Sequence, residues 1–249
     1  MYSKDASCMI SKLFSPLALC LLLALACNSP VEKPDVPVTP VDTVILEDKE
    51  PPIPTPEDTI AFEERLADYE SKDRVFWQKP DLVVDRLGDL STKTVADVGA
   101  GSGYFARRLA YKAKKVIAID IDPNFISFMD SIKLVELPRD IQQKFETRLA
   151  TFDDPKLEKG EADIVLMVNT YLYIQDRVDY MRRLKEGLAP GGKVVIIDYK
   201  KKRIPLTNPP QRIRVPLFEV EDELFEAGYS RVISDDTSLD YQYIIVARN

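Results

Sequence analysis

Histidine is absent from this chain, and all three cysteines lie within the first 27 residues. A histidine-based catalytic triad and an imidazole metal site are therefore excluded. Because the cysteines are Cys8, Cys20 and Cys27, the rest of the chain cannot form a disulfide framework. Glycine is also scarce, with 9 residues in 249. Three of them fall within residues 99–103, which marks that stretch as a place where the backbone turns sharply.

The N-terminal residues have the pattern of an export signal. Lys4 and Lys12 precede an apolar run, Leu13–Ala26, which Pro16 interrupts. That run is shorter than the roughly 20 apolar residues that span a bilayer. A charged start, a short apolar core and small residues before a break are typical of a secretory signal peptide.

The end of this signal, Ala-Leu-Ala-Cys, resembles the lipobox of bacterial lipoproteins. The resemblance implies that Cys27 is lipidated and becomes the N-terminus of a protein anchored to the membranes of the bacterial cell envelope. A cleaved signal that releases a soluble protein and an uncleaved anchor are the alternatives. We therefore expect residues 1–27 to be a lipoprotein-type signal peptide.

Residues 28–56 are expected to be a linker, because they hold eight of the 18 prolines and no periodic apolar pattern. Residues 28–60 contain eight acidic and two basic side chains, and they carry most of the net charge of −7. The acidity therefore belongs to the linker and says little about a substrate. We expect residues 57–249 to form one domain.

This domain alternates short apolar runs with amphipathic stretches, which predicts an α/β fold with a mostly parallel sheet and helices on both faces. The pattern is that of a Rossmann-like, doubly wound sheet of seven strands that ends in an antiparallel strand. Strands are predicted at 94–98, 115–120, 145–150, 163–168, 193–198, 230–234 and 241–247. Helices are predicted at 60–77, 81–90, 105–112, 124–137, 177–188 and 219–227.

The most informative run is Val95–Gly103, VADVGAGSG, between a predicted strand and a predicted helix. Such a turn lets a ligand approach the backbone and the free N–H groups of the helix. A dinucleotide-binding turn needs glycine or alanine three residues after its second glycine, and Tyr104 occupies that place. The other spacing is an acid followed by three alternate glycines: Asp97, Gly99, Gly101 and Gly103.

That spacing resembles the first motif of the class I S-adenosylmethionine (SAM)-dependent methyltransferases. The resemblance implies SAM as the cofactor. Asp120 ends the second predicted strand, where the family has an acid that holds the ribose hydroxyls, and Ile121 would cover the adenine. Asn169 ends the fourth predicted strand, where the family meets the methionine end of SAM. Residues 190–193, PGGK, resemble its turn into the fifth strand.

A further feature of the family is an acid four residues before a leucine, which contacts the adenine amino group. Asp153 and Leu157 have this spacing, and the neighbouring Asp154 is the other candidate. The segment 74–80, RVFWQKP, resembles the lead-in of a group of small bacterial methyltransferases, several of which carry export signals.

Candidates for the acceptor side follow the fourth and fifth predicted strands. Tyr171 and Tyr173 are expected to line the substrate site, and Asp198 is an acid near the pocket mouth. Residues 200–218 carry six basic side chains and no acid, which fits an anionic acceptor, a lipid head-group surface or a solvated basic loop.

Each candidate residue also has a structural interpretation. Asp97 and Asp120 can cap a loop or form a turn, and Asp153 can form an Asx turn before Pro155. Tyr171 and Tyr173 can be packing residues.

The function expected from these features is methyl transfer from SAM to a small-molecule or cell-envelope acceptor, with no nucleic-acid partner. A non-catalytic protein that binds SAM or an adenine nucleoside is the alternative, and an NAD oxidoreductase ranks behind both.

Overall fold

The computed structural model of the protein describes residues 56–249, which belong to one compact unit. Cys27, the predicted signal and almost all of the predicted linker lie outside the described residues. No helix among the described residues is both long and apolar enough to cross a membrane.

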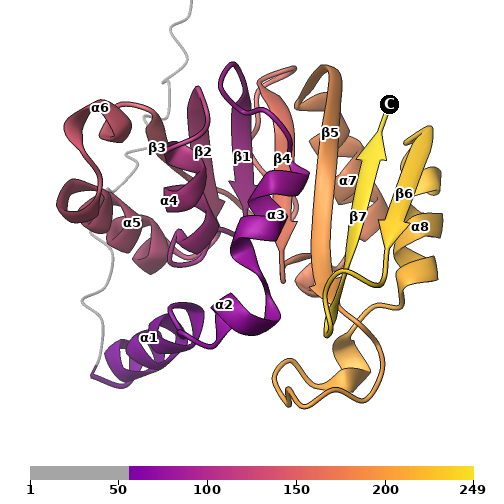
Figure 1. The fold of residues 1–249 in the computed structure, drawn as a ribbon, viewed down its shortest axis with the longest axis horizontal. Helices are drawn as coiled ribbons and strands as arrows, with labels where there is room; N and C mark the ends of the chain where they lie inside the picture. The colour runs from indigo at the N-terminus through magenta and orange to yellow at the C-terminus, as the bar shows by residue number, and fades with distance from the viewer. Residues whose placement is uncertain (1–55) are drawn as a thin grey trace, which may run out of the picture. The chain divides into compact units, whose positions relative to one another are not determined.

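Seven strands form one sheet in the order β3-β2-β1-β4-β5-β7-β6 (Figure 1). β1 to β5 pair in parallel, and β7 pairs antiparallel with both β5 and β6. The predicted α/β fold with a mostly parallel seven-stranded sheet is therefore confirmed. The strand bounds are β1 Thr94–Val98, β2 Lys115–Asp120, β3 Phe145–Leu149, β4 Ala162–Val168, β5 Leu188–Tyr199, β6 Arg231–Asp235 and β7 Gln242–Arg248.

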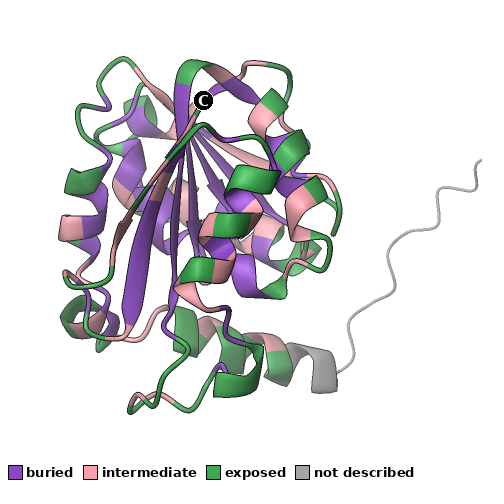
Figure 2. Cartoon of the chain, turned by 90° about the vertical axis from the view of Figure 1, so that its right-hand side faces the viewer, coloured by how far each residue is buried: buried purple, intermediate pink, exposed green. Residues whose placement is uncertain are grey.

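Helices cover both faces of the sheet because its central strands are apolar on both sides. The inner strands are almost wholly buried (Figure 2). One core holds side chains of α3, α4, α5 and α6, and the other holds side chains of α7 and α8. The bounds are α1 Pro56–Tyr69, α2 Arg74–Trp77, α3 Pro80–Arg86, α4 Tyr104–Ala110, α5 Pro123–Glu136, α6 Arg139–Gln142, α7 Arg177–Glu186 and α8 Leu217–Glu226, with 3-10 turns η1 Tyr171–Tyr173 and η2 Gln211–Ile213.

The helix predicted at residues 60–77 is in fact two helices, α1 and α2. The guanidinium of Arg74 donates to the carbonyl oxygen of Tyr69, which satisfies a carbonyl at the end of α1. A second break separates α2 from α3, because Lys79 adopts a left-handed conformation (φ 47°) directly before Pro80.

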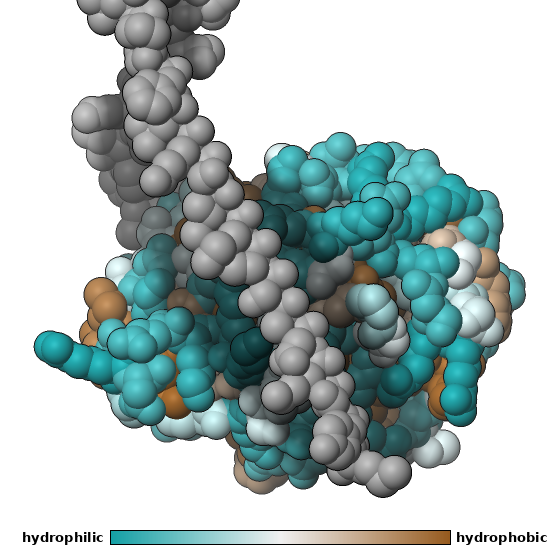
Figure 3. All heavy atoms as spheres, turned by 90° about the horizontal axis from the view of Figure 1, so that it is seen from above, coloured by the Kyte–Doolittle hydropathy of each residue, from teal (hydrophilic) through white to brown (hydrophobic). Residues whose placement is uncertain are grey.

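The parallel strands all end at the side of the sheet on which α1, α2 and the loop after β5 lie (Figure 1). The opposite end, where Lys114 precedes β2, is mostly hydrophilic where described residues are seen (Figure 3). Exposed apolar side chains, Phe152 and Tyr173 among them, follow strands at the carboxyl end. Ligands of open α/β sheets bind at that end.

The basic loop at 200–216 is held by two of its own cations. Lys200 is buried and donates to the carbonyl oxygens of Asp236 (2.6 Å) and Leu239 (2.8 Å). The buried Arg214 guanidinium donates to the carbonyl oxygens of Pro209 (2.7 Å), Leu206 (2.8 Å) and Lys202 (3.2 Å). It therefore braces the loop from within.

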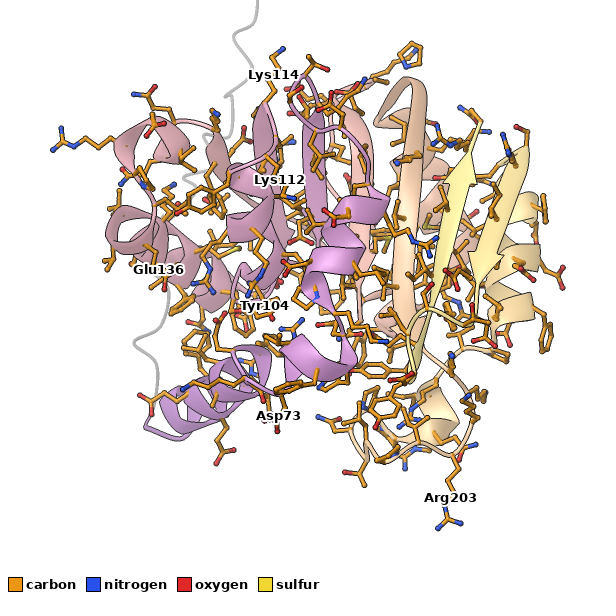
Figure 4. All side chains as sticks on the ribbon, in the orientation of Figure 1. Asp73, Tyr104, Lys112, Lys114, Glu136 and Arg203 are labelled. Carbon is orange, nitrogen blue, oxygen red and sulfur yellow. The ribbon has the colours of Figure 1, made fainter. Side chains whose placement is uncertain are left out.

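The other four basic side chains, Lys201, Lys202, Arg203 and Arg212, are exposed. Arg203 points away from the fold (Figure 4). The six basic residues therefore do not form one surface.

We predict that Arg214→Ala lowers the free energy of unfolding by about 2 kcal/mol or more, because three loop carbonyls lose a buried charged donor. Arg212→Ala is the matched control, since this side chain is exposed on the same loop. It should leave stability almost unchanged. Urea unfolding of both variants measures the difference. Equal effects would show that Arg214 does not brace the loop.

Candidate functional site

A pocket that opens to solvent lies at the carboxyl ends of β1, β2 and β4. Its walls are mainly apolar, and Asp120 is its only ionisable carboxylate among the lining residues. Four of the residues expected at the site line it, namely Gly99, Asp120, Ile121 and Tyr173. The structure adds eight more: Val98, Ile119, Ala150, Thr151, Phe152, Thr170, Ile174 and Tyr180.

Two neighbouring side chains lie so close to the glycine turn, residues 99–103, that two of its glycines have no room for a Cβ. A Cβ at Gly99 (φ 74°) would lie 2.5 Å from Cγ2 and 2.9 Å from Cβ of Thr170, just after β4. A Cβ at Gly101 would lie 2.8 Å from the ring of Tyr69 on α1. Gly103 (φ 77°) caps the start of α4. The turn thus lets β4 and α1 approach closely.

Asp120 joins the ends of β1 and β2. Its Oδ2 accepts the Gly101 N–H at 2.7 Å, and its Oδ1 accepts the Asp122 N–H at 3.0 Å. Burial raises the pKa of this carboxyl. Each oxygen keeps a lone pair, and the side chain reaches the pocket beside the half-exposed Ile121. A carboxylate so placed can accept hydrogen bonds from a pair of ligand hydroxyls.

Asp97 lies behind the glycine turn and is not among the residues that line the pocket. Burial raises its pKa to about 7, although the backbone N–H of Ala106 opposes that shift. Its Oδ2 is buried and has no hydrogen-bond partner among the described residues. The Asp97 carboxyl group therefore lies close to the first turn of α4, with one oxygen that has no donor among the described residues.

The two candidate tyrosines lie apart. Tyr173 is 59% exposed and lines the pocket. Tyr171 is fully buried, and its hydroxyl donates to Glu223 of α8 at 2.6 Å. The expectation that Tyr171 lines the substrate site is therefore wrong: residues 171–173 form a 3-10 turn, which sends alternate side chains in different directions.

Asp198 supports this 3-10 turn. It is buried and accepts N–H groups from Tyr199 (2.7 Å) and Leu172 (3.1 Å). Burial raises its pKa to about 7. The acid expected near the pocket mouth thus anchors the backbone that carries Tyr173.

Two further candidates lie outside the pocket lining. The side chain of Asp153 is 76% exposed and accepts from the Thr151 hydroxyl at 2.9 Å. The structure therefore does not place the Asp153 carboxylate at the pocket, where an adenine contact was expected, because the turn directs it to solvent. Asn169 has a left-handed backbone (φ 59°), and its amide oxygen accepts from Gln242 of β7. The neighbouring Thr170 reaches the pocket instead.

α1 lies over the glycine turn at the carboxyl end of the parallel strands. The Tyr69 ring stacks on Phe125 of α5 with centroids 5.2 Å apart. Glu70 accepts from the Ser102 hydroxyl (2.5 Å) and pairs with Arg107 (2.5 Å). Tyr104, the first residue of α4, lies at the end of that helix nearest α1 and α2 (Figure 4). These contacts were not foreseen, since no local pattern pairs residues so far apart in the chain.

We predict that Gly99→Ala destabilises the protein more than Gly160→Ala. Both glycines have similar φ, 74° and 71°, so both variants carry the same backbone strain. A Cβ at Gly160 meets nothing within 4 Å, whereas one at Gly99 collides with Thr170. Thermal unfolding should show the larger loss for Gly99→Ala, and equal losses would mean that Thr170 moves aside freely.

We also predict that stability falls as the pH rises from about 4 to about 7. Burial raises the folded pKa of Asp97 and of Asp198 to about 7 each, above the ordinary aspartate value of 3.8, so the folded state binds more protons over this range. The loss should be on the order of a few kcal/mol and smaller in Asp97→Asn. Urea unfolding at several pH values tests this, and a flat profile would contradict it.

Comparison with known proteins gives one domain match and several fold matches. Residues 96–196 match the family described as "Methyltransferase domain". Phosphoethanolamine N-methyltransferase 3 of Arabidopsis thaliana is 29% identical over 175 residues, which are 65% of this chain and 34% of that protein. This chain spans only about a third of the curated relatives first matched, which include tRNA U34 carboxymethyltransferases.

Solved methyltransferase structures share the fold. A SAM-dependent methyltransferase from Aquifex aeolicus superposes with a TM-score of 0.65 and 22% identity, over 74% of this chain and 96% of that one. Phosphoethanolamine N-methyltransferase 2 of Haemonchus contortus, solved with S-adenosylhomocysteine and phosphomonomethylethanolamine, gives a TM-score of 0.54 and 20% identity, over 70% and 46%. Residues 96–196 therefore resemble a methyltransferase domain, and the solved structures show that the chain shares the fold of SAM-dependent methyltransferases.

Proposed function

We propose that this protein transfers the methyl group of SAM to a small-molecule or cell-envelope acceptor. The observation that carries the proposal is the pocket at the carboxyl ends of β1, β2 and β4, whose apolar walls surround Asp120. A nucleoside needs this combination: a flat apolar slot for the base and a carboxylate for the ribose hydroxyls.

The adenosine half of SAM fits the described residues. Asp120 would accept from the ribose hydroxyls with the lone pairs that its two backbone bonds leave free. Ile121 and Phe152 are exposed apolar residues of the pocket wall and would cover the base. The sulfur end of SAM would lie close to the backbone of the glycine turn.

The methionine half of SAM has an ammonium and a carboxylate, and both have buried counterparts near the glycine turn. Oδ2 of Asp97 has no donor among residues 56–249 and would attract the ammonium. Gln78 is fully buried, and its Nε2 has no acceptor within the same described residues. Its Oε1 accepts from Arg74 at 2.7 Å. Gln78 and Arg74 would together hold the carboxylate.

The acceptor should be a group that needs no protein base. SAM supplies an activated methyl, so the protein mainly has to align the acceptor atom. Asp198 is buried among backbone N–H groups, and the pKa of Tyr173 is raised, chiefly by burial. We therefore propose an acceptor with an available lone pair at neutral pH, such as an ionised acid, which Tyr173 would line.

The proposed location is the cell envelope, with the chain held there through Cys27. The apolar signal-like segment and its terminal cysteine support this. The exposed Lys201, Lys202 and Arg203 near the carboxyl end of the sheet are compatible with an anionic acceptor there.

We predict that Asp120→Ala weakens SAM and S-adenosylhomocysteine binding by about 10- to 100-fold, the usual loss of about 1–3 kcal/mol for a charged hydrogen-bond partner. Asp153→Ala is the control and should bind within about twofold of the wild type. Calorimetric titration of the purified full chain measures both, with NAD as a third ligand.

Micromolar binding of SAM and its product, but not NAD, would support the proposal. Binding of neither by a folded wild-type protein would overturn it. Unchanged affinity in a folded Asp120→Ala variant would refute the ribose contact alone. Tight binding without methyl transfer to any envelope extract would favour the non-catalytic alternative.

A further inference from the structure

The base end of the pocket lacks the carboxylate expected there. Asp153 points to solvent. Asp154 accepts from the backbone N–H of Lys156 at 2.7 Å and from its ammonium at 2.8 Å. Among the described residues, neither acid lines the pocket, so an adenine bound there needs a different hydrogen-bonding partner.

Most polar side chains that line the pocket already have partners. The Thr151 hydroxyl donates to Asp153, and the Thr170 hydroxyl donates to the carbonyl oxygen of Val168 at 3.1 Å. Asp120 holds two backbone N–H groups. The hydroxyls of Tyr173 and Tyr180 are the two lining groups without a hydrogen-bond partner in the described part of the chain.

Tyr180 is a largely buried residue that lines the pocket. It lies on α7 and is 6% exposed, with its ring packed in the core that α7 shares with α8. Three other buried tyrosines of this core, Tyr171, Tyr229 and Tyr243, direct their hydroxyls at protein acceptors, whereas Tyr180 and Tyr199 have none among the described residues. Of these last two, only Tyr180 lines the pocket, so its hydroxyl is available to hydrogen-bond a bound ligand.

Tyr180 lines the pocket together with Ile121, which follows β2, and residues 150–152, which follow β3. Its ring belongs to the same buried core as Ala150. With the ribose at Asp120 and the sulfur directed to the glycine turn, the base must extend toward residues 150–152 and Tyr180.

We propose that the Tyr180 hydroxyl hydrogen-bonds the edge of the adenine ring and takes the place of an acid in recognising the base. This inference rests on the proposed SAM site and deepens it. A hydroxyl can donate or accept, whereas a carboxylate only accepts. Base recognition at this site therefore tolerates a purine that carries a carbonyl in place of the adenine amino group.

The test compares Tyr180→Phe with the wild-type full chain by calorimetry. The probes are S-adenosylhomocysteine and 5′-methylthioadenosine, which keeps the adenosine and loses the amino acid. Removal of one ligand hydrogen bond should raise both dissociation constants by about 5- to 20-fold. The midpoint of thermal unfolding without ligand should be unchanged, because this hydroxyl has no partner among the described residues.

Tyr229→Phe is the matched control, since it removes a hydroxyl from the same core. That hydroxyl donates to the carbonyl oxygen of Met181 at 3.2 Å, away from the pocket. We expect this variant to unfold at a lower temperature and to bind both probes within about twofold of the wild type.

A second measurement uses the wild type alone. 5′-Methylthioinosine, in which a carbonyl replaces the amino group, should bind within about tenfold of 5′-methylthioadenosine. A loss above a hundredfold would contradict a hydroxyl contact, as would Tyr180→Phe binding both adenosine probes normally. Failure of the wild type to bind any probe would instead refute the proposed function.

Discussion

The hydrogen bond from the Gly101 N–H to Oδ2 of Asp120 ties together the two strand ends that form the site. β1 and β2 are adjacent parallel strands, so the turn after β1 and the acid at the end of β2 reach the same edge of the sheet. This bond fixes the turn against the carboxylate. The fixed turn determines how closely β4 approaches through Thr170, and how closely α1 approaches through Tyr69.

The pocket is therefore a consequence of close approach between elements. Thr170 closes one side because Gly99 has no side chain, and the ring of Tyr69 covers Gly101 for the same reason. Two buried acids lie on either side: Asp97 is close to the first turn of α4, and Asp198 holds the 3-10 turn that presents Tyr173. Oδ2 of Asp97 and Nε2 of Gln78 have no partners in the described part of the chain, and the proposed zwitterionic ligand would supply them.

The tyrosines illustrate why a linear motif locates a site better than it assigns roles within it. Tyr171 and Tyr173 are two residues apart, which in a strand would place them on one face. The chain there forms a 3-10 turn, so Tyr171 enters the core and meets Glu223, which is 52 residues away. Tyr180 carries no motif at all. Only the packing of α7 against the sheet brings its ring to the pocket.

The sequence by itself determined the sheet, the strand ends and the glycine turn, because alternating apolar runs and a spaced acid-glycine motif are local patterns. It also located Asp120, since an acid at a strand end follows directly from the run before it. The tertiary structure alone decided that Tyr171 enters the core, that Lys200 is bound by the backbone of residues 236 and 239, and that α1 covers the turn. Those outcomes depend on contacts between residues distant in the chain, and no local pattern encodes which partners will meet.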